Sequence, residues 1–330
     1  MGIAMEDQSV LIVGTGALAC LFASRLPAAG ASVTMLGTWE AGLQALQRHG
    51  VRVEAAERSE RVSRECAYPV KATADPGACA GVRLALVLVK SWQTARVAAQ
   101  LAQCLSPEGV ALTLQNGLGN RETLTDALGA DRVALGVTTT GATLLGPGRV
   151  RPGGEGSVSV GIHPRLDPLV DILRQAGFTV EQVGQADDLL WSKLVINAAI
   201  NPLTALLRVP NGELLRRPSA RALMAQLARE ATAVARALGR QLTYPNSVAT
   251  AEDVARRTAV NHSSMFQDVQ RGAPTEIDAI CGAIVSVGEQ QGVPTPVNRT
   301  LWRLVKASLE GVGEKEREGE RKYANRDSLS

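Results

Sequence analysis

Three polar side chains recur at helical spacing in an otherwise apolar segment in the second half of the chain. Lys193, Asn197 and Asn201 lie four residues apart within residues 189–207, most of whose other residues are Leu, Ile, Val and Ala. This spacing places them on one stripe of a helix, and the apolar remainder predicts that the helix is largely buried. Burying an unpaired ammonium or amide costs several kcal/mol. The stripe therefore needs partners, either other protein groups or a bound polar ligand.

Lys193 is the residue of this stripe whose type indicates chemistry. Asparagine is common in internal hydrogen-bond networks, but lysine is almost never fully buried without a partner. We therefore favour a residue that lines a cleft over a purely structural network. Desolvation lowers the pKa of a lysine, which would help Lys193 to give its proton to a developing alkoxide. Pro202, which follows Asn201, is expected to end or kink the helix.

A second chemical signal is a glycine-rich turn between a predicted strand and a predicted helix near the start of the chain. Its residues are Gly14, Thr15, Gly16, Ala17, Leu18 and Ala19. In such a turn the first glycine allows the tight bend, the second leaves room for a pyrophosphate, and the third small residue lets helix and strand pack closely. The phosphate would meet the unsatisfied N–H groups of the helix N-terminus. We interpret the turn as dinucleotide-binding rather than as a packing turn.

The end of the second predicted strand is where dinucleotide-binding folds select their cofactor. An Asp or Glu there holds a ribose 2′-hydroxyl, and a nearby Arg accommodates a 2′-phosphate. This chain has Gly37, Thr38, Trp39 and Glu40 instead, with neither type in the expected place. Thr38 could hydrogen-bond either group, and the Trp39 ring could cover the adenine. These residues leave the choice between NAD and NADP open.

The elements that must position these residues change in kind near residue 185. Before it, apolar strands alternate with helices, which is typical of a doubly wound α/β sheet of the Rossmann type. The expected strands are 9–13, 31–36, 83–89, 109–114, 132–139, 157–162 and 178–183, and the expected helices are 20–29, 94–105, 121–128 and 168–176. After it, only helices are expected, at 187–207, 219–238, 251–260, 276–290 and 296–309.

This change predicts the domain organisation. We expect a dinucleotide-binding domain over residues 1–185 and an all-α substrate-binding and catalytic domain over residues 186–312. Residues 313–330 are rich in Glu, Lys and Arg and have little to bury, so they are expected to form a flexible tail.

The composition excludes several classes of protein. A chain of 330 residues with 45% hydrophobic residues is folded, and a net charge of +3 with 3% aromatic residues offers no basic face or stacking platform for nucleic acid. The five cysteines lack metal-ligand spacing, which indicates reduced thiols and no metal. Charges interrupt every apolar stretch before about 18 residues accumulate, and the start has no apolar signal core. We therefore expect a cytoplasmic protein without a membrane segment.

Together, the turn and the Lys193 helix resemble the ketopantoate reductases (2-dehydropantoate 2-reductases) of the 6-phosphogluconate-dehydrogenase-like group. The likeness runs from about Ser9 to Leu309 and rests on eight blocks in one order, which is far more specific than any single block. The blocks are residues 14–19, 89–93, 115–119, 191–193, 197 with 201–205, 210–214, 263–268 and 275–278.

The resemblance implies NADPH-dependent reduction of 2-dehydropantoate to (R)-pantoate, a step toward pantothenate and coenzyme A. It implies that Lys193 is the general acid and that Glu276 is the carboxylate that helps to hold Lys193 and the ligands. It assigns Asn197, Asn201, Asn261, Ser264 and Asn116 to the substrate, and Thr38, Lys90, Asn116 and Glu276, with the glycine-rich turn, to the cofactor. The family often has an Arg at or next to position 38, which this chain lacks. NADP(H) therefore rests on the resemblance, and NAD(H) stays open.

Each of these residues also has a structural interpretation. Asn116 and Gly117 form an ordinary turn dipeptide, Asn261 and Ser264 could be a solvated helix face or a cap, and Glu276 could start a helix near its positive dipole end. Lys90 could be an exposed residue at the end of a strand.

The function has alternatives as well. The same scaffold could reduce another 2-oxo acid or an imine, because a fold does not fix a substrate. A catalytically silent dinucleotide sensor is a further alternative, but it would need no proton donor like Lys193. The resemblance allows a homodimer, on which the sequence itself is silent.

Overall fold

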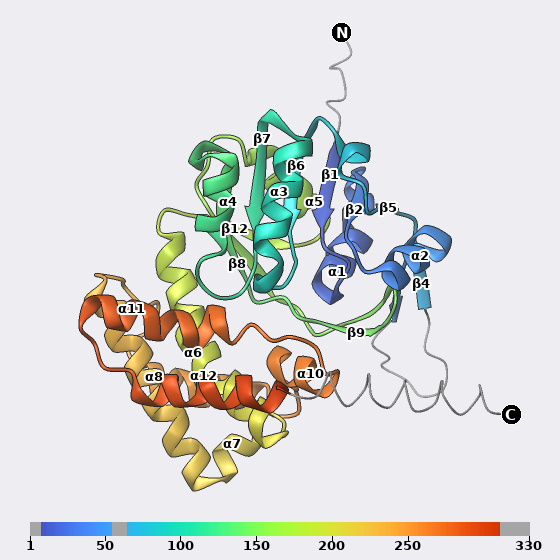
Figure 1. Cartoon of the computed structure of the whole chain (residues 1–330). Helices are drawn as coiled ribbons and strands as arrows, with labels where there is room; N and C mark the ends of the chain where they lie inside the picture. Colours follow the sequence, from blue (N-terminus) through green and yellow to red (C-terminus); the bar gives the residue numbers. More distant parts are fainter. Residues whose placement is uncertain (1–7, 55–64, 311–330) are drawn as a thin grey trace, which may run out of the picture. The chain divides into compact units, whose positions relative to one another are not determined.

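The computed structural model describes residues 8–54 and 65–310, which form two compact units (Figure 1). The first unit comprises the described residues up to Gln115 together with Gly119–Ala186. The second comprises Asn116–Leu118 and the described residues from Asp187 onward. The sequence did not predict that the loop residues Asn116–Leu118 belong to the second unit. The predicted tail at 313–330 lies outside the described residues.

The first unit is built on an eight-stranded sheet with the order β12-β11-β8-β7-β6-β1-β2-β5. Its strands are β1 (Ser9–Val13), β2 (Ser32–Leu36), β5 (Lys71–Thr73), β6 (Val82–Val87), β7 (Leu105–Thr113), β8 (Val133–Thr138), β11 (Ser157–Gly161) and β12 (Thr179–Val183). Neighbouring strands run parallel, except that β11 pairs antiparallel with β8. This order, with crossover helices between parallel strands, confirms the predicted α/β class.

Helices cover both faces of this sheet. The helices that pack on the sheet are α1 (Ala17–Arg25), α3 (Thr94–Cys104), α4 (Asn120–Leu128) and α5 (Asp167–Gln175). In β1, Val10 and Ile12 belong to the core formed with α1 and α5, whereas Leu11 and Val13 belong to the core formed with α3 and α4. Because successive side chains of a strand point to opposite faces, a strand covered on both faces must be apolar at every position.

A second, four-stranded sheet with the order β4-β3-β10-β9 was not predicted. Its strands are β3 (Val51–Glu54), β4 (Glu65–Tyr68), β9 (Ala142–Gly146) and β10 (Arg149–Pro152). The helix α2 (Glu40–His49), which directly precedes β3, was not predicted either. These strands are short and half-exposed, so they lack the apolar runs that mark the main sheet. Val51 and Val150 are nonetheless fully buried in the core that contains α1. Packing on this side as well leaves residues Ala19–Ser24 of α1 almost without exposure.

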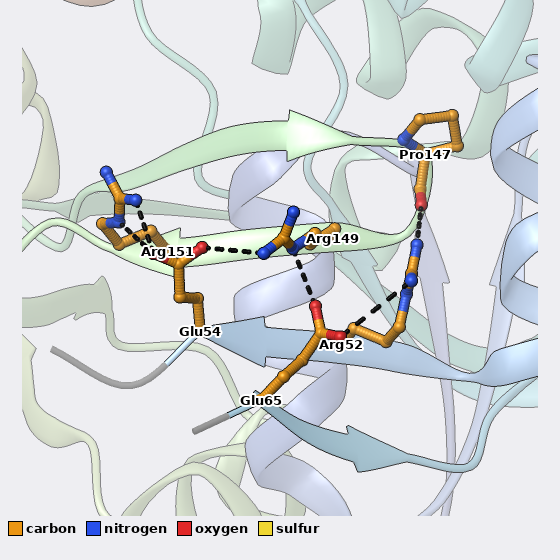
Figure 2. A network of polar contacts seen from close by, with 6 residues as sticks. All are labelled: Arg52, Glu54, Glu65, Pro147, Arg149 and Arg151. Atoms are coloured by element: carbon orange, nitrogen blue, oxygen red, sulfur yellow. Dashed lines mark hydrogen bonds and ion pairs between the residues drawn. The ribbon is translucent and has the colours of Figure 1, made fainter. Parts of the chain in front are cut away.

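The small sheet carries a network of Arg and Glu side chains between its strands (Figure 2). Arg149 on β10 meets Glu54 on β3 at 3.2 Å and Glu65 on β4 at 2.7 Å. Arg151 donates to Glu54 through Nε at 3.1 Å, and Arg52 donates to the Pro147 carbonyl at 3.4 Å. The network therefore joins β3, β4 and β10 through side chains in addition to the backbone ladder.

The second unit is helical, as predicted. Its helices are α6 (Ala186–Leu207), α7 (Glu213–Arg216), α8 (Pro218–Ala237), α9 (Ser247–Arg257), α10 (Ser264–Gln270), a π-helical turn (Asp278–Gly282), α11 (Ala283–Gln291) and α12 (Pro296–Leu309). The short helices α7 and α10 were not predicted. α9 starts four residues earlier than expected, because the Asn246 side chain accepts from the N–H groups of Val248 and Ala249 and caps it there.

Helix α6 is the central element of this unit. Leu194, Val195, Ala198 and Ala199 have at most 1% exposure. The helix does not end at Pro202 but continues to Leu207, because burial against neighbouring helices outweighs the one backbone hydrogen bond that proline removes. By length and composition α6 could also cross a membrane, but 72% of its most apolar window is buried inside the protein, as in a core helix.

Candidate active site

The glycine-rich turn has the geometry that a pyrophosphate requires. Gly14 has φ +132°, and a Cβ there would lie 2.9 Å from the Leu88 carbonyl oxygen, so the position demands glycine. Gly16 is the N-cap of α1, and a Cβ there would meet no atom within 4 Å. The lack of a side chain at Gly16 therefore leaves open space at the end of the helix rather than relieving a contact inside the protein.

The first turn of α1 is free to receive an anion. No side chain caps it, and it holds no acidic residue, so the N–H groups and the positive end of the dipole are not neutralised locally. Ala17 and Leu18 are half-buried there, Thr15 is buried, and Ala19 lies fully buried in the core. This geometry is compatible with a dinucleotide phosphate, and the assignment of these residues to a cofactor stays a prediction.

Further candidate residues follow the carboxyl ends of parallel strands on either side of β1. Thr38 is exposed after β2, and Lys90 is half-buried after β6 at the start of a 3₁₀ turn, where its N–H donates to Gln93 Oε1 at 3.3 Å. In open α/β sheets, ligands bind beyond these strand ends. The Trp39 ring packs closely against Gly42 of α2, where a Cβ would clash with the ring.

Gln115, after β7, was not among the predicted site residues. Its Nε2 donates to the Val89 carbonyl at 3.1 Å and to Thr94 Oγ1 at 2.8 Å, and Thr94 Oγ1 in turn contacts Asn120 Oδ1 at 2.8 Å. The signal that the sequence offered was an amide residue directly after an apolar strand. Gln115 fixes the loop after β6 against the loop after β7, immediately before Asn116 begins the second unit's share of the chain.

In the second unit, Lys193, Glu276 and Asn116 come together although 160 residues separate the last two. Asn116 Nδ2 donates to Glu276 Oε2 at 3.1 Å, and Glu276 is only 4% exposed. Burial lowers the pKa of Lys193 to about 8, and the Glu276 carboxylate acts in the opposite direction by raising it. A lysine with this pKa holds and releases its proton close to neutral pH, as a general acid requires.

The backbone explains how Asn116 reaches Glu276. Gly117 has φ +84°, and a Cβ there would lie 2.5 Å from the Ala279 carbonyl oxygen, while the Leu118 N–H donates to the same oxygen at 2.9 Å. The loop thus docks on the π-helical turn that begins two residues after Glu276. The expectation that a helix starts at Glu276 is wrong, because the regular helix begins only at Ala283. π-Helical turns are frequent at functional sites.

The other two members of the stripe lie on α6 beyond Lys193. Asn197 is half-buried and Asn201 is 8% exposed. One turn further, Thr204 is fully buried, and its hydroxyl lies 2.7 Å from that of Ser263 and 3.0 Å from the Asn201 carbonyl oxygen. Glu276 therefore acts on the Lys193 end of the stripe, and the N-terminus of α10 packs at the other end.

Asn261 and Ser264 flank that N-terminus but do not share a helix face. Asn261 is exposed in the turn before α10, and Ser264 is the half-buried first residue of the helix. The cap is neither of them but Ser263, whose Oγ accepts from the Phe266 N–H at 3.1 Å. Ser263 thus sets the start of the helix on which Ser264 lies.

Asn211 lies in the block of residues 210–214, which supports the resemblance, but it was not predicted as a site residue. Its Nδ2 donates to Thr258 Oγ1 at 2.8 Å and its N–H donates to the Asn261 carbonyl at 3.0 Å. Its Oδ1 is buried without a hydrogen-bond partner. Such an orphaned acceptor is costly.

Family models match both units of the chain. The model described as "Ketopantoate reductase PanE/ApbA" matches residues 10–165, and the one described as "Ketopantoate reductase PanE/ApbA C terminal" matches residues 185–310. A protein of Archaeoglobus fulgidus named 2-dehydropantoate 2-reductase is 37% identical over 313 residues, which cover 93% of this chain and 100% of that protein.

Solved structures show the same fold. A PanE/ApbA family ketopantoate reductase from Ralstonia eutropha JMP134 matches with a TM-score of 0.83 and 34% identity, covering 92% of this chain and 98% of that one. A D-mandelate dehydrogenase in complex with NADH matches with a TM-score of 0.81 and 25% identity, covering 92% and 99%.

Proposed function

Because the chain belongs to the ketopantoate reductase family, we propose that it reduces 2-dehydropantoate to (R)-pantoate with a reduced nicotinamide dinucleotide. A family membership that covers both units supports the reaction class, and the Lys193–Glu276–Asn116 cluster supports the chemistry. A bound reduced nicotinamide supplies a hydride to the keto carbon.

In the proposed mechanism, the ammonium group of Lys193 donates its proton to the ketone oxygen as negative charge develops there. The transferred proton comes from a nitrogen whose pKa is lowered to about 8 by burial, so that the loss of a proton costs little at neutral pH. Glu276, held by Asn116 at 3.1 Å, keeps Lys193 charged until that step and orients it. Asn197, Asn201, Asn261 and Ser264 are proposed to bind the polar groups of the substrate.

The single observation that carries this proposal is the lysine on a buried helix whose proton affinity is set by burial and by one carboxylate. The test is the oxidation of NADPH and NADH in the presence of 2-dehydropantoate and a panel of other 2-oxo acids. We expect turnover with 2-dehydropantoate at the highest kcat/KM. Cofactor binding without turnover of any keto acid would instead support the silent-sensor alternative.

A second substrate class is favoured by one specific observation. A D-mandelate dehydrogenase shares the fold at 25% identity, so an aromatic 2-oxo acid belongs in the panel. A higher kcat/KM with such an acid than with 2-dehydropantoate would move the assignment to a related 2-hydroxy-acid dehydrogenase. Because both reactions reduce a ketone next to a carboxylate, the proposed role of Lys193 would be the same.

For the cofactor we propose NADP(H), on the strength of the family resemblance. Two observations favour NAD(H) instead. Thr38 stands where an Arg usually binds the 2′-phosphate, and the D-mandelate dehydrogenase was solved with NADH. The ratio of kcat/KM for NADPH and NADH decides between the cofactors. In Thr38→Arg the ratio is expected to rise by about tenfold or more, since a charge-assisted contact contributes about 1.5–3 kcal/mol. An unchanged ratio would mean that Thr38 does not face the adenosine.

Two further parts of the proposal concern the whole protein. We propose a cytoplasmic location, which the role in biosynthesis supports, and a homodimer, which the resemblance supports. Light scattering of the purified protein measures the mass directly, and a monomer at micromolar concentration would contradict the second part.

A further inference from the structure

The helical unit contains a surface hollow in a region that no part of the proposed reaction uses. It has a volume of about 410 Å³ where it lies between α8 and the start of α9, and an adjoining part of about 170 Å³ reaches under the loop 239–246. The larger part falls within the size range of small-molecule sites. Arg236, Thr232 and Ser247 line both parts, so the two form one continuous feature.

The charge of this hollow is positive. Arg229 and Arg236 lie seven residues apart on α8, which places them on one face of the helix, and Arg240 follows in the loop. None of the described residues that line the hollow is acidic. Within the described ranges the side chains of Arg229 and Arg236 make no hydrogen bond or ion pair, whereas the Arg221 side chain on the same helix is held by Glu252 at 2.7 Å.

The floor of the hollow offers polar groups that suit an anion. Thr232 and Ser247 are each 8% exposed, and their hydroxyls lie 2.8 Å apart. Arg240 lies 3.9 Å from the Asp187 carboxylate through Nη1, and its Nε is buried without a hydrogen-bond partner among the described residues. Two arginines one heptad apart are separated by about 10 Å along the helix, so together with Arg240 they match a ligand with more than one anionic group.

The loop that roofs the smaller part is attached to α6 beside Lys193. The Thr243 N–H donates to Ser192 Oγ at 2.9 Å, and the Tyr244 hydroxyl donates to the Ser192 carbonyl at 2.8 Å. Ser192 Oγ donates in turn to the Asp188 carbonyl at 2.7 Å. Burial raises the pKa of Tyr244, so its hydroxyl stays protonated and can donate this hydrogen bond.

We propose that this hollow binds a small metabolite that carries a diphosphate or two separate phosphate groups, and that its occupation fixes the loop 239–246 against Ser192. Arg229 and Arg236 would bind the anionic groups from α8, and Arg240 from the loop. Because one ligand then contacts both α8 and the loop, its binding free energy also stabilises the loop in its docked position. The site is distinct from the glycine-rich turn, which belongs to the other unit.

The test is calorimetric titration of inorganic pyrophosphate into the full chain with one equivalent of NADPH, so that the dinucleotide turn is occupied without an excess of dinucleotide that would itself compete for the hollow. We expect saturable binding to the wild-type protein and at least tenfold weaker binding to Arg229→Gln/Arg236→Gln, because two charge-assisted contacts are lost. The matched control is Arg216→Gln/Arg221→Gln, which removes the same charge from arginines outside the hollow and is expected to bind within twofold of wild type. Inorganic phosphate, with a single anionic group, is expected to bind at least tenfold more weakly than pyrophosphate.

The attachment of the loop is tested by hydrogen exchange of the Thr243 amide, which needs no enzymatic activity. Pyrophosphate is expected to slow this exchange at least threefold in the wild type and in the control, but not in Arg229→Gln/Arg236→Gln. The proposal is overturned if binding is not saturable or if both double variants lose it equally. Unchanged exchange at full saturation would overturn the effect on the loop. A failure to reduce any keto acid would refute the proposed reaction without touching these measurements.

Discussion

Two groups of charged side chains, one in each unit, use the same residue types in opposite ways. The network on the small sheet joins Arg149 and Arg151 to Glu54, with Arg149 also reaching Glu65 (Figure 2). The side chains of Arg149 and Arg151 are 39% and 52% exposed. In the helical unit, Lys193 is half-buried, and its partner Glu276 is 4% exposed and held by an amide.

The difference teaches how burial decides what an ion pair does. Exposed pairs gain about 0.2–1 kcal/mol each and are screened by salt, so the network of the small sheet serves to align its strands. Desolvation of the half-buried Lys193 lowers its pKa to about 8. The first group joins strands, and the second is proposed to hold a proton that Lys193 gives to the substrate. Three substitutions and one pH profile test this contrast, and they follow from the largest expected effect to the smallest.

The largest effect is expected from Lys193→Ala. Removal of the proton donor should lower kcat by about 10²–10⁴-fold, while the helix is kept because alanine favours it. Steady-state reduction of 2-dehydropantoate measures the loss, and circular dichroism verifies the fold. The control is Arg151→Gln in the exposed network, which should keep kcat within about twofold. Wild-type kcat in Lys193→Ala would remove the proposed role of this residue.

A smaller loss is expected from Glu276→Gln. A hydrogen bond to a charged group contributes about 1.5–3 kcal/mol, so kcat/KM should fall by about 10- to 100-fold. Because the carboxylate raises the pKa of Lys193, its removal should also move the alkaline limb of the pH–rate profile to lower pH. A purely structural role for Glu276 would reduce the rate without moving that limb, so the pH profile separates the two interpretations.

The wild-type pH profile is the third test. A general acid must be protonated, and burial lowers the pKa of Lys193 to about 8. The kcat/KM for reduction should therefore be level below this pH and fall by about tenfold per unit above it. Measurements from about pH 6 to 10 at constant ionic strength locate the limb. A profile that stays level to pH 10 would mean that no group with this pKa donates the proton.

The smallest effect is expected from Glu54→Gln in the exposed network. Its contacts with Arg149 and Arg151 should together contribute about 0.4–2 kcal/mol to the free energy of unfolding, and this difference should shrink as salt is added. Urea unfolding at low and high salt measures both quantities. We expect kcat to be unchanged, and a large loss of kcat would show that the small sheet affects the reaction.

Much of the fold was predictable because its signals are local. The strand β1 follows from its continuous apolar run and the stripe on α6 from a periodicity of 3.6 residues, both of which a chain reveals without any long-range contact. The small sheet was missed because its strands are short and carry charge on their exposed face. The expected bounds 187–207 agree with α6 (Ala186–Leu207), but Pro202 does not end the helix there, because tertiary packing, which propensity does not contain, outweighs the local penalty.

The sequence by itself determined the α/β and helical classes, the glycine-rich turn between β1 and α1 and the presence of a lysine on an apolar helix. Only the tertiary structure decided that Asn116 would hold Glu276, that Ser263 rather than Ser264 would cap α10, and that Gln115 would join two loops. These contacts link residues far apart along the chain, and their formation depends on where the backbone returns. The pKa of Lys193 follows from the same cause, because desolvation and the field of a distant carboxylate exist only once the chain is folded.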